Sequence, residues 1–329
     1  MRTRASATQP PADLRSRNLK TVQRLSLDML GRPTGSRVPT TVDYQKQFSV
    51  GSGTVQKALA ILEHSGAVTL SRHGHLGTRL VDQDEGLLWS MSGRGQVRLA
   101  LHPPGPITGF GLLRGLQSEF DTLGVPLDVR YAHGGEDRAE LVVSGEVDAG
   151  LVSAGIAESL RRALRRKITT VTVGEGLYYA PGSVFVVRRE DAAKRPRRVR
   201  VGVDRTSHDH TVVTTAAFPE DAKNVYVDCP YSQVLTALLE RRIDVALWHS
   251  TLLPVPLTAM GLTATPLEDD AAVQALATVS DAVIVLRRDD LALGRLVERI
   301  DTGALSREAE DLLRLDPAAP DLQSRVWER

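Results

Sequence analysis

The polar residues best suited to hold a small ligand follow predicted strands in the C-terminal two thirds of the chain. In the segment DRTSHDHT, Asp204, Ser207 and His208 precede a predicted helix. Trp248-His249-Ser250 ends an apolar run that is predicted to be a strand. In α/β folds, strand ends and helix starts supply the few polar groups that orient a ligand. These positions therefore predict a small-molecule site.

Two more segments belong to the predicted site. The segment 102–111, HPPGPITGFG, places glycines before a helix, and Ser153 ends another strand. Free backbone N–H groups at such helix starts can bind an anion. We therefore expect an anionic metabolite, a carboxylate or a phosphate. The predicted ligand-binding residues are Pro104, Thr108, Ser153, Asp204, Ser207, His208, Trp248, His249 and Ser250.

Each of these features has a second interpretation. DRTSHDHT can simply be a polar loop that caps a helix through Ser207 or Asp209. Trp248 is more often a core residue than a ligand platform. The spacing of Asp204, His208, Asp209 and His210 matches no strong metal motif, so no metal and no cofactor are predicted.

Catalytic motifs give no positive signal. The sequence has no Walker A, GxSxG, HExxH or strand-following GxGxxG pattern. Its single cysteine, Cys229, excludes an intrachain disulfide and a cysteine-based zinc site. We predict a protein that is not an enzyme and assign no catalytic residue. The alternative is an enzyme on a binding-protein-like fold with an accessory DNA-binding head, which turnover by residues 95–329 would reveal.

The elements that must position these residues alternate between strand and helix from Val97 onward. That alternation predicts an α/β fold with a mostly parallel sheet. Two βαβαβ runs, separated near residues 175–198, predict two lobes, with Tyr179 and Ser280 near the crossovers. The basic run from Lys194 to Arg200 is interpreted as a solvated loop and strand entrance rather than a second DNA contact.

The N-terminal segment has a different pattern. A helix is expected from Asp13 to about Leu30, a short helix from Thr40 or Thr41 to Phe48, and a third from Ser52 to His64. Gly66 suits a left-handed C-terminal cap. AVTLSRHGHLGTRLV then predicts two strands around a turn that contains glycine.

The third of these helices has the length and the leading residues to read double-stranded DNA. Its first turn holds Ser, Thr, Gln and Lys, which can contact bases or phosphates in the major groove. The following hairpin carries basic side chains that could reach the DNA backbone or the minor groove. The predicted DNA-binding residues are Arg37, Thr40, Thr41, Ser52, Gly53, Thr54, Gln56, Lys57, Arg72, His73, His75 and Arg79.

The charge distribution separates this segment from the rest of the chain. Residues 1–80 hold twelve Lys and Arg against four Asp and Glu, a net charge of +8, whereas the remainder carries −7. A basic module on a mildly acidic body favours a polyanion as partner of the module. A winged helix used for protein contact is the alternative.

Residues 35–81 resemble the winged helix-turn-helix of the GntR family of bacterial repressors. The resemblance rests on Phe48-Ser49-Val50, Gly53-Thr54-Val55, Lys57-Ala58-Leu59 and the wing end Gly77-Thr78. That family often has arginines where this chain has Val42 and Ser52, so its base readout is expected to differ. The whole chain, with EDRAELVVSGEVDAGLVSAG, resembles the YhfZ-like subgroup, which implies a type 2 periplasmic-binding-protein-like domain that senses an effector.

The predicted domains are a flexible arm (1–12), a winged helix-turn-helix domain (13–81), a linker (82–96), a two-lobed α/β domain (97–315) and a tail (316–329). The linker is expected to hold a short strand around Leu87 to Trp89. Without a long apolar run or a secretory signal, the protein is expected in the cytoplasm and away from membranes. A homodimer is expected, because two heads match a pseudo-palindromic site, and the predicted role is that of a repressor.

Overall fold

A computed structural model describes residues 12–192, 198–221, 223–251 and 253–313. The chain divides into two compact units, which are described separately. The first unit comprises Met1–Val97, Asp121–Pro126 and Asp290–Arg299; the second comprises Arg98–Phe120, Leu127–Asp289 and the chain from Ile300 onward. The predicted arm, except residue 12, and the predicted tail lie outside the described residues, as does most of the basic run that starts at Lys194.

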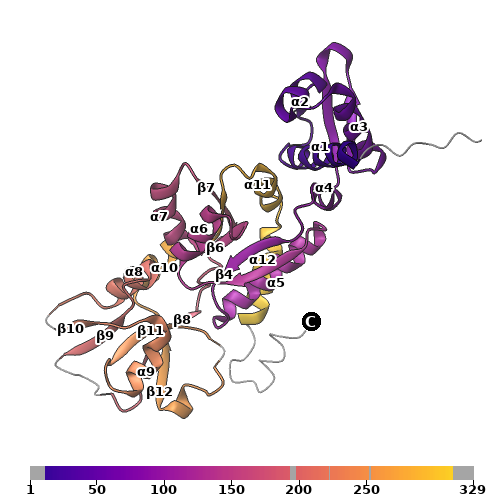
Figure 1. Cartoon of the computed structure of the whole chain (residues 1–329). Helices are drawn as coiled ribbons and strands as arrows, with labels where there is room; N and C mark the ends of the chain where they lie inside the picture. Colours follow the sequence, from indigo (N-terminus) through magenta and orange to yellow (C-terminus); the bar gives the residue numbers. More distant parts are fainter. Residues whose placement is uncertain (1–11, 193–197, 222, 252, 314–329) are drawn as a thin grey trace, which may run out of the picture. The chain divides into compact units, whose positions relative to one another are not determined.

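The first unit is a winged helix-turn-helix with two additional helices. Its three-stranded sheet has the order β1-β3-β2, and β3 pairs antiparallel with both neighbours. The helices and strands are α1 (Ala12–Leu30), β1 (Arg37–Val38), α2 (Thr41–Phe48), α3 (Ser52–His64), β2 (Val68–Arg72), β3 (Thr78–Gln83), α4 (Glu85–Ser92) and α11 (Leu291–Val297). The predicted three helices and two wing strands are therefore present (Figure 1).

A polar network joins α1 to α2 beneath the apolar core. The hydroxyl of the fully buried Tyr44 donates to Asp28 Oδ2 at 2.5 Å, and Arg32 contacts both oxygens of Asp28 at 2.6 and 2.9 Å. Tyr44 also stacks on Phe48, the last residue of α2, with ring centroids 5.3 Å apart. These contacts fix the orientation of α2 relative to α1.

The short strand expected in the linker is wrong, because this segment forms helix α4. The Asp84 side chain caps the helix by accepting a hydrogen bond from the Leu87 N–H at 2.8 Å. Leu88 and Trp89 are buried, and Trp89 Nε1 donates to the Gly95 carbonyl at 2.5 Å. An aspartate cap followed by adjacent apolar residues indicates a helix. This signal was outweighed by the glycines at positions 86, 93 and 95, which are more typical of a linker.

Helix α11 belongs to the first unit although it follows the strands of the second unit in sequence. Gly31 directly follows α1, and a Cβ atom on this glycine would lie 3.2 Å from the Cβ atom of Leu291 in α11. Asp290 caps α11 and pairs with Arg94 at 2.7 Å, and Arg299 pairs with Glu85 of α4. Helices α1, α4 and α11 thus pack together.

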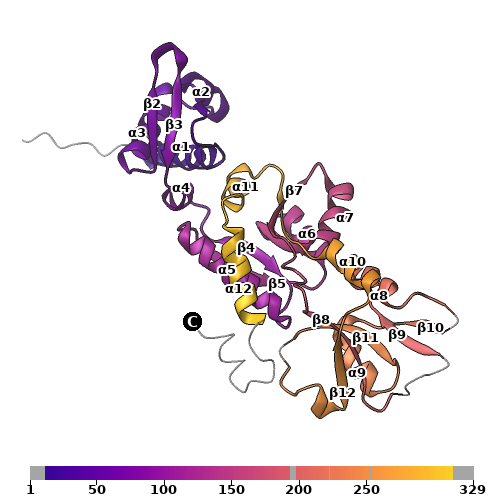
Figure 2. The ribbon, with the colours of Figure 1, turned by 180° about the vertical axis from the view of Figure 1, so that it is seen from behind.

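The second unit has two lobes, each built on a five-stranded sheet (Figures 1 and 2). The first sheet has the order β5-β4-β6-β13-β7, and the second has the order β10-β9-β11-β8-β12. The first-lobe strands are β4 (Val97–Leu101), β5 (Leu127–Tyr131), β6 (Ala149–Ser153), β7 (Ile168–Gly174) and β13 (Ala282–Arg287). The second-lobe strands are β8 (Val184–Arg189), β9 (Val199–Val203), β10 (Asn224–Asp228), β11 (Val245–His249) and β12 (Leu262–Pro266).

Seven helices of the second unit pack on these sheets. They are α5 (Ile107–Thr122), α6 (Gly135–Ser144), α7 (Ala154–Leu164), α8 (His208–Ala217), α9 (Val234–Leu239), α10 (Asp270–Val279) and α12 (Thr302–Leu313). The last two residues of α5 and the first of β4 are counted with the first unit. Apolar side chains of α6 and α7 pack on the first sheet, and those of α9 pack on the second.

The two-lobed α/β prediction is confirmed, and the sheets are mostly parallel as expected, with β13 and β8 as the strands that run in the opposite direction. Strands β4 and β6 are parallel, as are β9 with β10 and β11. Strand β13 runs antiparallel to β6 and β7, and β8 runs antiparallel to β11 and β12. The reason is that β8 and β13 are the strands that enter each lobe from the other, so they traverse the sheet in the opposite direction.

Helices α5 and α12 lie side by side in both views (Figures 1 and 2), and glycines permit their close approach. A Cβ atom on Gly111 would lie 2.5 Å from Ala309 Cα, and one on Gly115 would lie 3.0 Å from Leu305 Cα. Because backbone atoms of α12 occupy this space, any side chain on Gly111 must displace the helix.

Replacement of Gly111 by alanine is therefore expected to lower the free energy of unfolding by about 2 kcal/mol, because the cost of overpacking exceeds the gain in helix propensity. Urea denaturation of the full chain measures this change. The matched control is Gly105→Ala, whose nearest neighbour would be 3.6 Å away and which should change stability little. Unchanged stability of Gly111→Ala would contradict the packing of α12 on α5.

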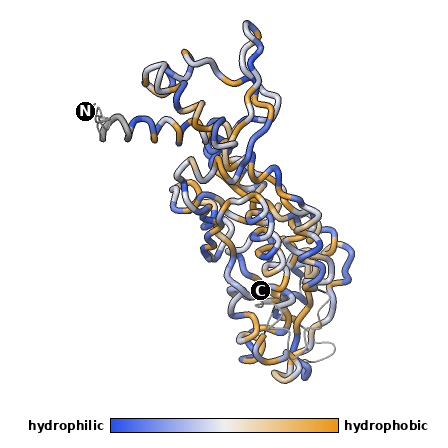
Figure 3. The backbone as a smooth tube through the Cα atoms, turned by 90° about the vertical axis from the view of Figure 1, so that its right-hand side faces the viewer, coloured by the Kyte–Doolittle hydropathy of each residue, from blue (hydrophilic) through white to orange (hydrophobic). Residues whose placement is uncertain are grey.

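Apolar residues are distributed in short stretches along the whole trace (Figure 3). Within the described part of the chain, no helix combines the length and the apolar character needed to cross a membrane.

Candidate functional site

The first candidate site is the helix-turn-helix formed by α2 and α3. Thr40 and Asp43 form a capping box at the start of α2, in which Thr40 Oγ1 accepts from the Asp43 N–H at 3.2 Å. Ser49 ends α2 in the left-handed conformation, with φ 56°, and so turns the chain sharply. Gly51 precedes α3 without a side-chain cap, so the helix begins with an open N-terminus.

The leading turn of α3 is accessible. Ser52, Gly53, Gln56 and Lys57 are exposed and Thr54 is half-buried, whereas Val55, Ala58 and Leu62 hold the opposite face in the core. Lys57 makes no hydrogen bond or ion pair with any described residue. The residues predicted to read the major groove therefore share one open face of α3.

The remaining predicted DNA-binding residues surround the wing and the start of α2. Arg37, Thr40, Arg72, His73, His75 and Arg79 are exposed, and Thr41 is half-buried. Two of the arginines already have partners: Arg72 pairs with Glu63 of α3, and Arg79 Nη1 donates to the Gly35 carbonyl at 2.7 Å. Leu76, at the tip of the wing, is 62% exposed. Arg72 and Arg79 thus also help to hold the wing in place.

The second candidate site is a cavity of about 500 Å³ between the lobes of the second unit. Its walls are the loops after β4 and β5 on the first lobe and the loops after β9 and β10 with the end of β11 on the second. Tyr178 and Tyr179, from the crossover between β7 and β8, also line it. The size lies in the range of small-molecule sites.

Six of the nine predicted ligand-binding residues line this cavity: Pro104, Thr108, Asp204, Ser207, Trp248 and His249. Ser153, His208 and Ser250 do not. Ser153 is fully buried and caps α7 by accepting from the Ile156 N–H, His208 is exposed, and the Ser250 N–H donates to the Ser183 carbonyl at 2.6 Å. Ser207 was expected either to cap a helix or to contact a ligand. It caps α8 and also lines the cavity.

The glycine-containing loop before α5 does not present a free helix start. The Ile107 N–H, first in α5, donates to the Ser250 carbonyl at 2.9 Å, and Thr108 Oγ1 donates to the Tyr178 carbonyl at 3.4 Å. A Cβ atom on Gly109 would lie 2.1 Å from His102 Cε1, so this glycine makes room for the imidazole. The first N–H of α5 and the space beside Gly109 are therefore used by the protein itself.

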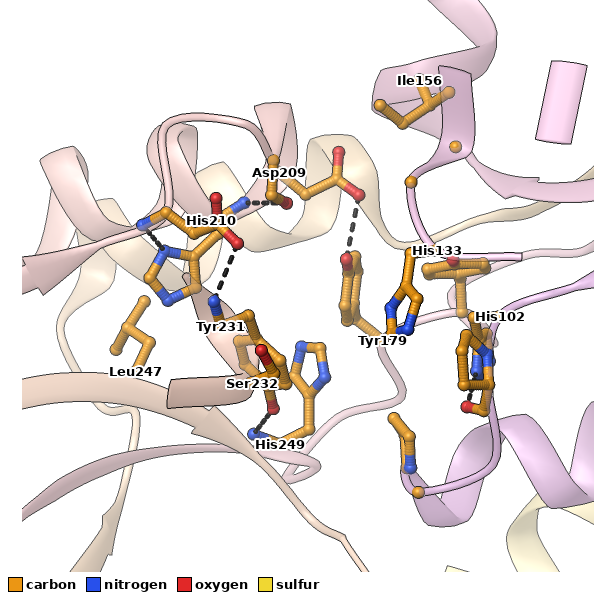
Figure 4. A pocket seen from close by; sticks show the side chains of 18 of the residues that line it. His102, His133, Ile156, Tyr179, Asp209, His210, Tyr231, Ser232, Leu247 and His249 are labelled. Atoms are coloured by element: carbon orange, nitrogen blue, oxygen red, sulfur yellow. Dashed lines mark hydrogen bonds between the residues drawn. The ribbon is translucent and has the colours of Figure 1, made fainter. Parts of the chain in front are cut away.

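A continuous series of aromatic rings crosses the cavity. From His102 the ring centroids are 5.9 Å apart to Tyr178, 5.0 Å on to Tyr179 and 4.9 Å on to His249. From His249 the series continues to Tyr231 at 5.0 Å, and Tyr231 stacks on Trp248 at 4.6 Å. Figure 4 shows Tyr179 with His102 and His133 on one side and Tyr231 and His249 on the other.

Three histidines of the cavity are held neutral by burial. Loss of hydration lowers the pKa of His249 to about 3 and that of His102 to about 4. Burial also lowers the pKa of His210, whose Nδ1 accepts from the Asp204 N–H at 3.1 Å. At neutral pH these rings therefore act as polar but uncharged groups.

The two aspartates of the second lobe differ in their environments. Burial raises the pKa of Asp209, although the Tyr179 hydroxyl donates to its Oδ2 at 2.9 Å and Ser153 lies nearby. Asp204 is also desolvated, yet hydrogen bonds from Thr206 and the Tyr231 N–H hold its pKa below the usual value. Asp204 is thus an ionised residue that organises its own loops, whereas Asp209 is poorly compensated.

The first lobe contributes a buried cation that the sequence analysis missed. Arg138 of α6 is 3% exposed and lines the cavity. Its guanidinium donates to the carbonyls of Leu151, Ala132 and His133 at 2.8, 2.9 and 3.4 Å, and to the Tyr178 hydroxyl at 3.0 Å. Among the described residues it has no carboxylate partner. In the sequence, an arginine within EDRAELVVS looks like an ordinary surface residue of a helix.

Asp204, His208, Asp209 and His210 do not assemble into a metal centre. Within the described ranges, no group of three or more His, Cys, Asp or Glu residues is arranged to hold a metal ion.

Together, the two sites define a helix-turn-helix protein with a two-lobed α/β domain that holds a cavity of small-molecule size. The chain belongs to the YhfZ family, because the model of the YhfZ C-terminal domain matches residues 84–317. A model described as a helix-turn-helix domain matches residues 33–80. That description does not distinguish the GntR family from other helix-turn-helix families, so the GntR resemblance stays a prediction.

Three known proteins show how far this similarity extends. The uncharacterized protein YhfZ of Escherichia coli (strain K12) is 28% identical over 280 residues, which are 85% of this chain and 89% of that protein. The crystal structure of YhfZ from Shigella flexneri covers 68% of this chain and 99% of its own, with 26% identity and a TM-score of 0.44. A periplasmic substrate-binding protein of an ABC transporter from Coxiella burnetii covers 66% and 96%, with 14% identity and a TM-score of 0.45.

Proposed function

We propose that this protein is a transcription repressor that binds DNA through α3 and the wing, and whose second unit binds a small effector with an anionic group. The observation that carries the proposal is the presence, on one chain, of an open recognition-helix face and a lined cavity of small-molecule size. The net charge of +8 over residues 1–80 supports DNA as the partner of the first unit.

We further propose that the protein acts as a homodimer on a pseudo-palindromic site, since two symmetry-related heads match two half-sites. Sedimentation equilibrium of the free protein and of its DNA complex tests this point. Two chains per duplex are expected, and a single chain bound to one half-site would contradict the dimer.

The exposed Lys57 gives a direct test of the proposed interface. If its ammonium contacts a phosphate, Lys57→Ala weakens binding about tenfold and lowers the slope of log K against log salt by about one. Fluorescence anisotropy at several salt concentrations measures both quantities.

The matched control is Lys223→Ala, which removes the same charge from an exposed position of the second unit. This variant should leave both the affinity and the slope unchanged. Equal effects of the two substitutions would mean that Lys57 acts only through net charge, and the assignment of α3 as the DNA-contacting helix would be wrong.

A further inference from the structure

The charged groups that line the cavity do not match a ligand that is only an anion. The lining contains one arginine, Arg138, and three carboxylates, those of Asp204, Asp209 and Glu136. Since burial keeps His102, His210 and His249 neutral, these three of the four lining histidines add no positive charge. A ligand that brings only negative charge would therefore meet more carboxylates than cations.

The two deeply buried charges of the cavity lie on different lobes, and each lacks an opposite charge. Arg138, on the first lobe, contacts three backbone carbonyls and one phenol. Asp209, on the second lobe, is 5% exposed and accepts from Tyr179, and no lysine or arginine of the described chain pairs with it. A buried charge without a partner is costly, so an opposite charge on a ligand would be strongly favoured at each position.

Two consecutive residues connect these charges. The Tyr178 hydroxyl accepts from Arg138 Nη2 at 3.0 Å, which leaves its own proton available to donate. The Tyr179 hydroxyl donates to Asp209 Oδ2 at 2.9 Å, as Figure 4 shows. Their ring centroids are 5.0 Å apart, and all four residues line the same cavity.

The rings beside Asp209 suit a positive group. The ring of His249 lies between those of Tyr179 and Tyr231, with centroid distances of 4.9 Å to Tyr179 and 5.0 Å to Tyr231. The ring of Trp248 stacks on that of Tyr231. Aromatic faces attract an organic ammonium, and the attraction increases when water is excluded. At the other end of the cavity, the guanidinium of Arg138 and the hydroxyl of Tyr178 are hydrogen-bond donors suited to a carboxylate.

We propose that the cavity binds a small zwitterion, with its carboxylate at Arg138 and Tyr178 and its protonated amine at Asp209 against the rings of Tyr179 and His249. The proposal rests on the proposed function, because it specifies the effector of the same cavity. It retains the anionic group of that effector and adds a cationic one on the opposite lobe.

Isothermal titration calorimetry on the full chain without DNA tests this assignment. The probes are ω-amino acids from glycine to 6-aminohexanoate, the trimethylated form of each, the matched amines and acids that lack one charge, and inorganic phosphate. At least one zwitterion is expected to bind about tenfold more tightly than its matched amine and acid. Tighter binding of the acids or of phosphate, or no zwitterion binding at about 10 mM, would overturn the proposal.

Two nearly isosteric variants assign the two ends of the ligand. Asp209→Asn should weaken zwitterion and amine binding about tenfold and spare the acid, whereas Tyr178→Phe should weaken zwitterion and acid binding and spare the amine. Glu140→Gln is the control, because Glu140 of the same helix α6 is exposed and does not line the cavity, so affinity should change by less than about twofold. Thermal denaturation confirms that each variant is folded, and equal losses for all three probes in both variants would overturn the assigned orientation.

Failure of this proposal and failure of the proposed function are distinguishable. A zwitterion that binds without any change in DNA affinity supports the ligand assignment and contradicts the regulator. A change of DNA affinity that follows only a singly charged anion supports the regulator and overturns the zwitterion.

Discussion

Lowering the pH from 7 to 5 is expected to cost the second unit about 4 kcal/mol of unfolding free energy, shared between His102 and His249. Burial places their pKa values at about 4 and about 3, against an ordinary 6.5. Below pH 6.5 the unfolded histidines bind protons that the folded ones do not. The stabilisation is therefore complete above pH 6.5 and is lost as the pH falls toward the folded pKa values.

Two other buried groups also contribute in this pH range. Burial lowers the pKa of His210 as well, so this ring adds to the loss of stability as the pH falls. The raised pKa of Asp209 acts in the opposite direction, because folding then favours its protonated form. The lowered pKa values of Asp204 and Asp244 matter only near and below pH 4. Urea denaturation at pH 7, 6 and 5 measures the slope.

The variant His249→Phe tests the origin of this slope, and it should remove about 2 kcal/mol of the loss between pH 7 and 5, since one of the three buried imidazoles is removed. The cavity's aromatic character is kept in this variant. Equal stability of the parent protein at pH 7 and pH 5 would contradict the burial of both rings.

Asp290→Ala is expected to lower the stability of the first unit by about 3 kcal/mol, because it breaks a buried ion pair and removes a helix cap. The side chain of Asp290 is 6% exposed, pairs with Arg94 at 2.7 Å and accepts from the Leu293 N–H at 3.1 Å. The adjacent Asp289→Ala is the matched control, because that side chain is 85% exposed. Denaturation of the full chain compares the two, and equal losses would contradict the role assigned to Asp290.

The same variant should also reduce the effect of ligand on DNA binding. The N–H groups of Tyr178 and Tyr179 donate to the Ser280 carbonyl at 2.7 and 3.3 Å, and β13 begins two residues later. Strand β13 continues directly into Asp290 and α11, which packs with α1 and α4 in the first unit. Ligand affinity should be unchanged in Asp290→Ala, while the ligand-dependent shift in DNA affinity should shrink. If the ligand-dependent shift in DNA affinity were as large in Asp290→Ala as in the parent protein, the effect of the ligand would not depend on the Asp290 contacts of α11.

The parts of the fold that are encoded locally could be predicted from the sequence. Helix α3 begins at Ser52 and ends at His64 as predicted, because Gly51 and Gly66 mark its limits with nearby residues alone. Strand β12 and helix α10 were not predicted, because the mostly exposed LTATP lacks the apolar alternation of a strand and the Asp269 cap before α10 was overlooked. The direction of β8 and β13 depends on crossing between lobes, which no local pattern encodes.

The candidate ligand site was predictable only where its residues follow strands. Asp204, Trp248 and His249 lie at such ends, and the structure places them in the cavity wall. Arg138 escaped notice because its burial depends on carbonyls from β6 and from the loop after β5. The aromatic series likewise joins residues from both lobes and the crossover, so only the folded chain brings these rings together.

Recognition of DNA through α3 is tested by selecting bound sequences from random duplex DNA with the purified full chain, at a stated salt concentration and beside the Lys57→Ala variant. We predict enrichment of a pseudo-palindromic consensus by the parent protein, with binding that weakens as salt increases and enrichment that is reduced in the variant. Enrichment of no sequence, or equal enrichment by the two proteins, would contradict DNA recognition through α3.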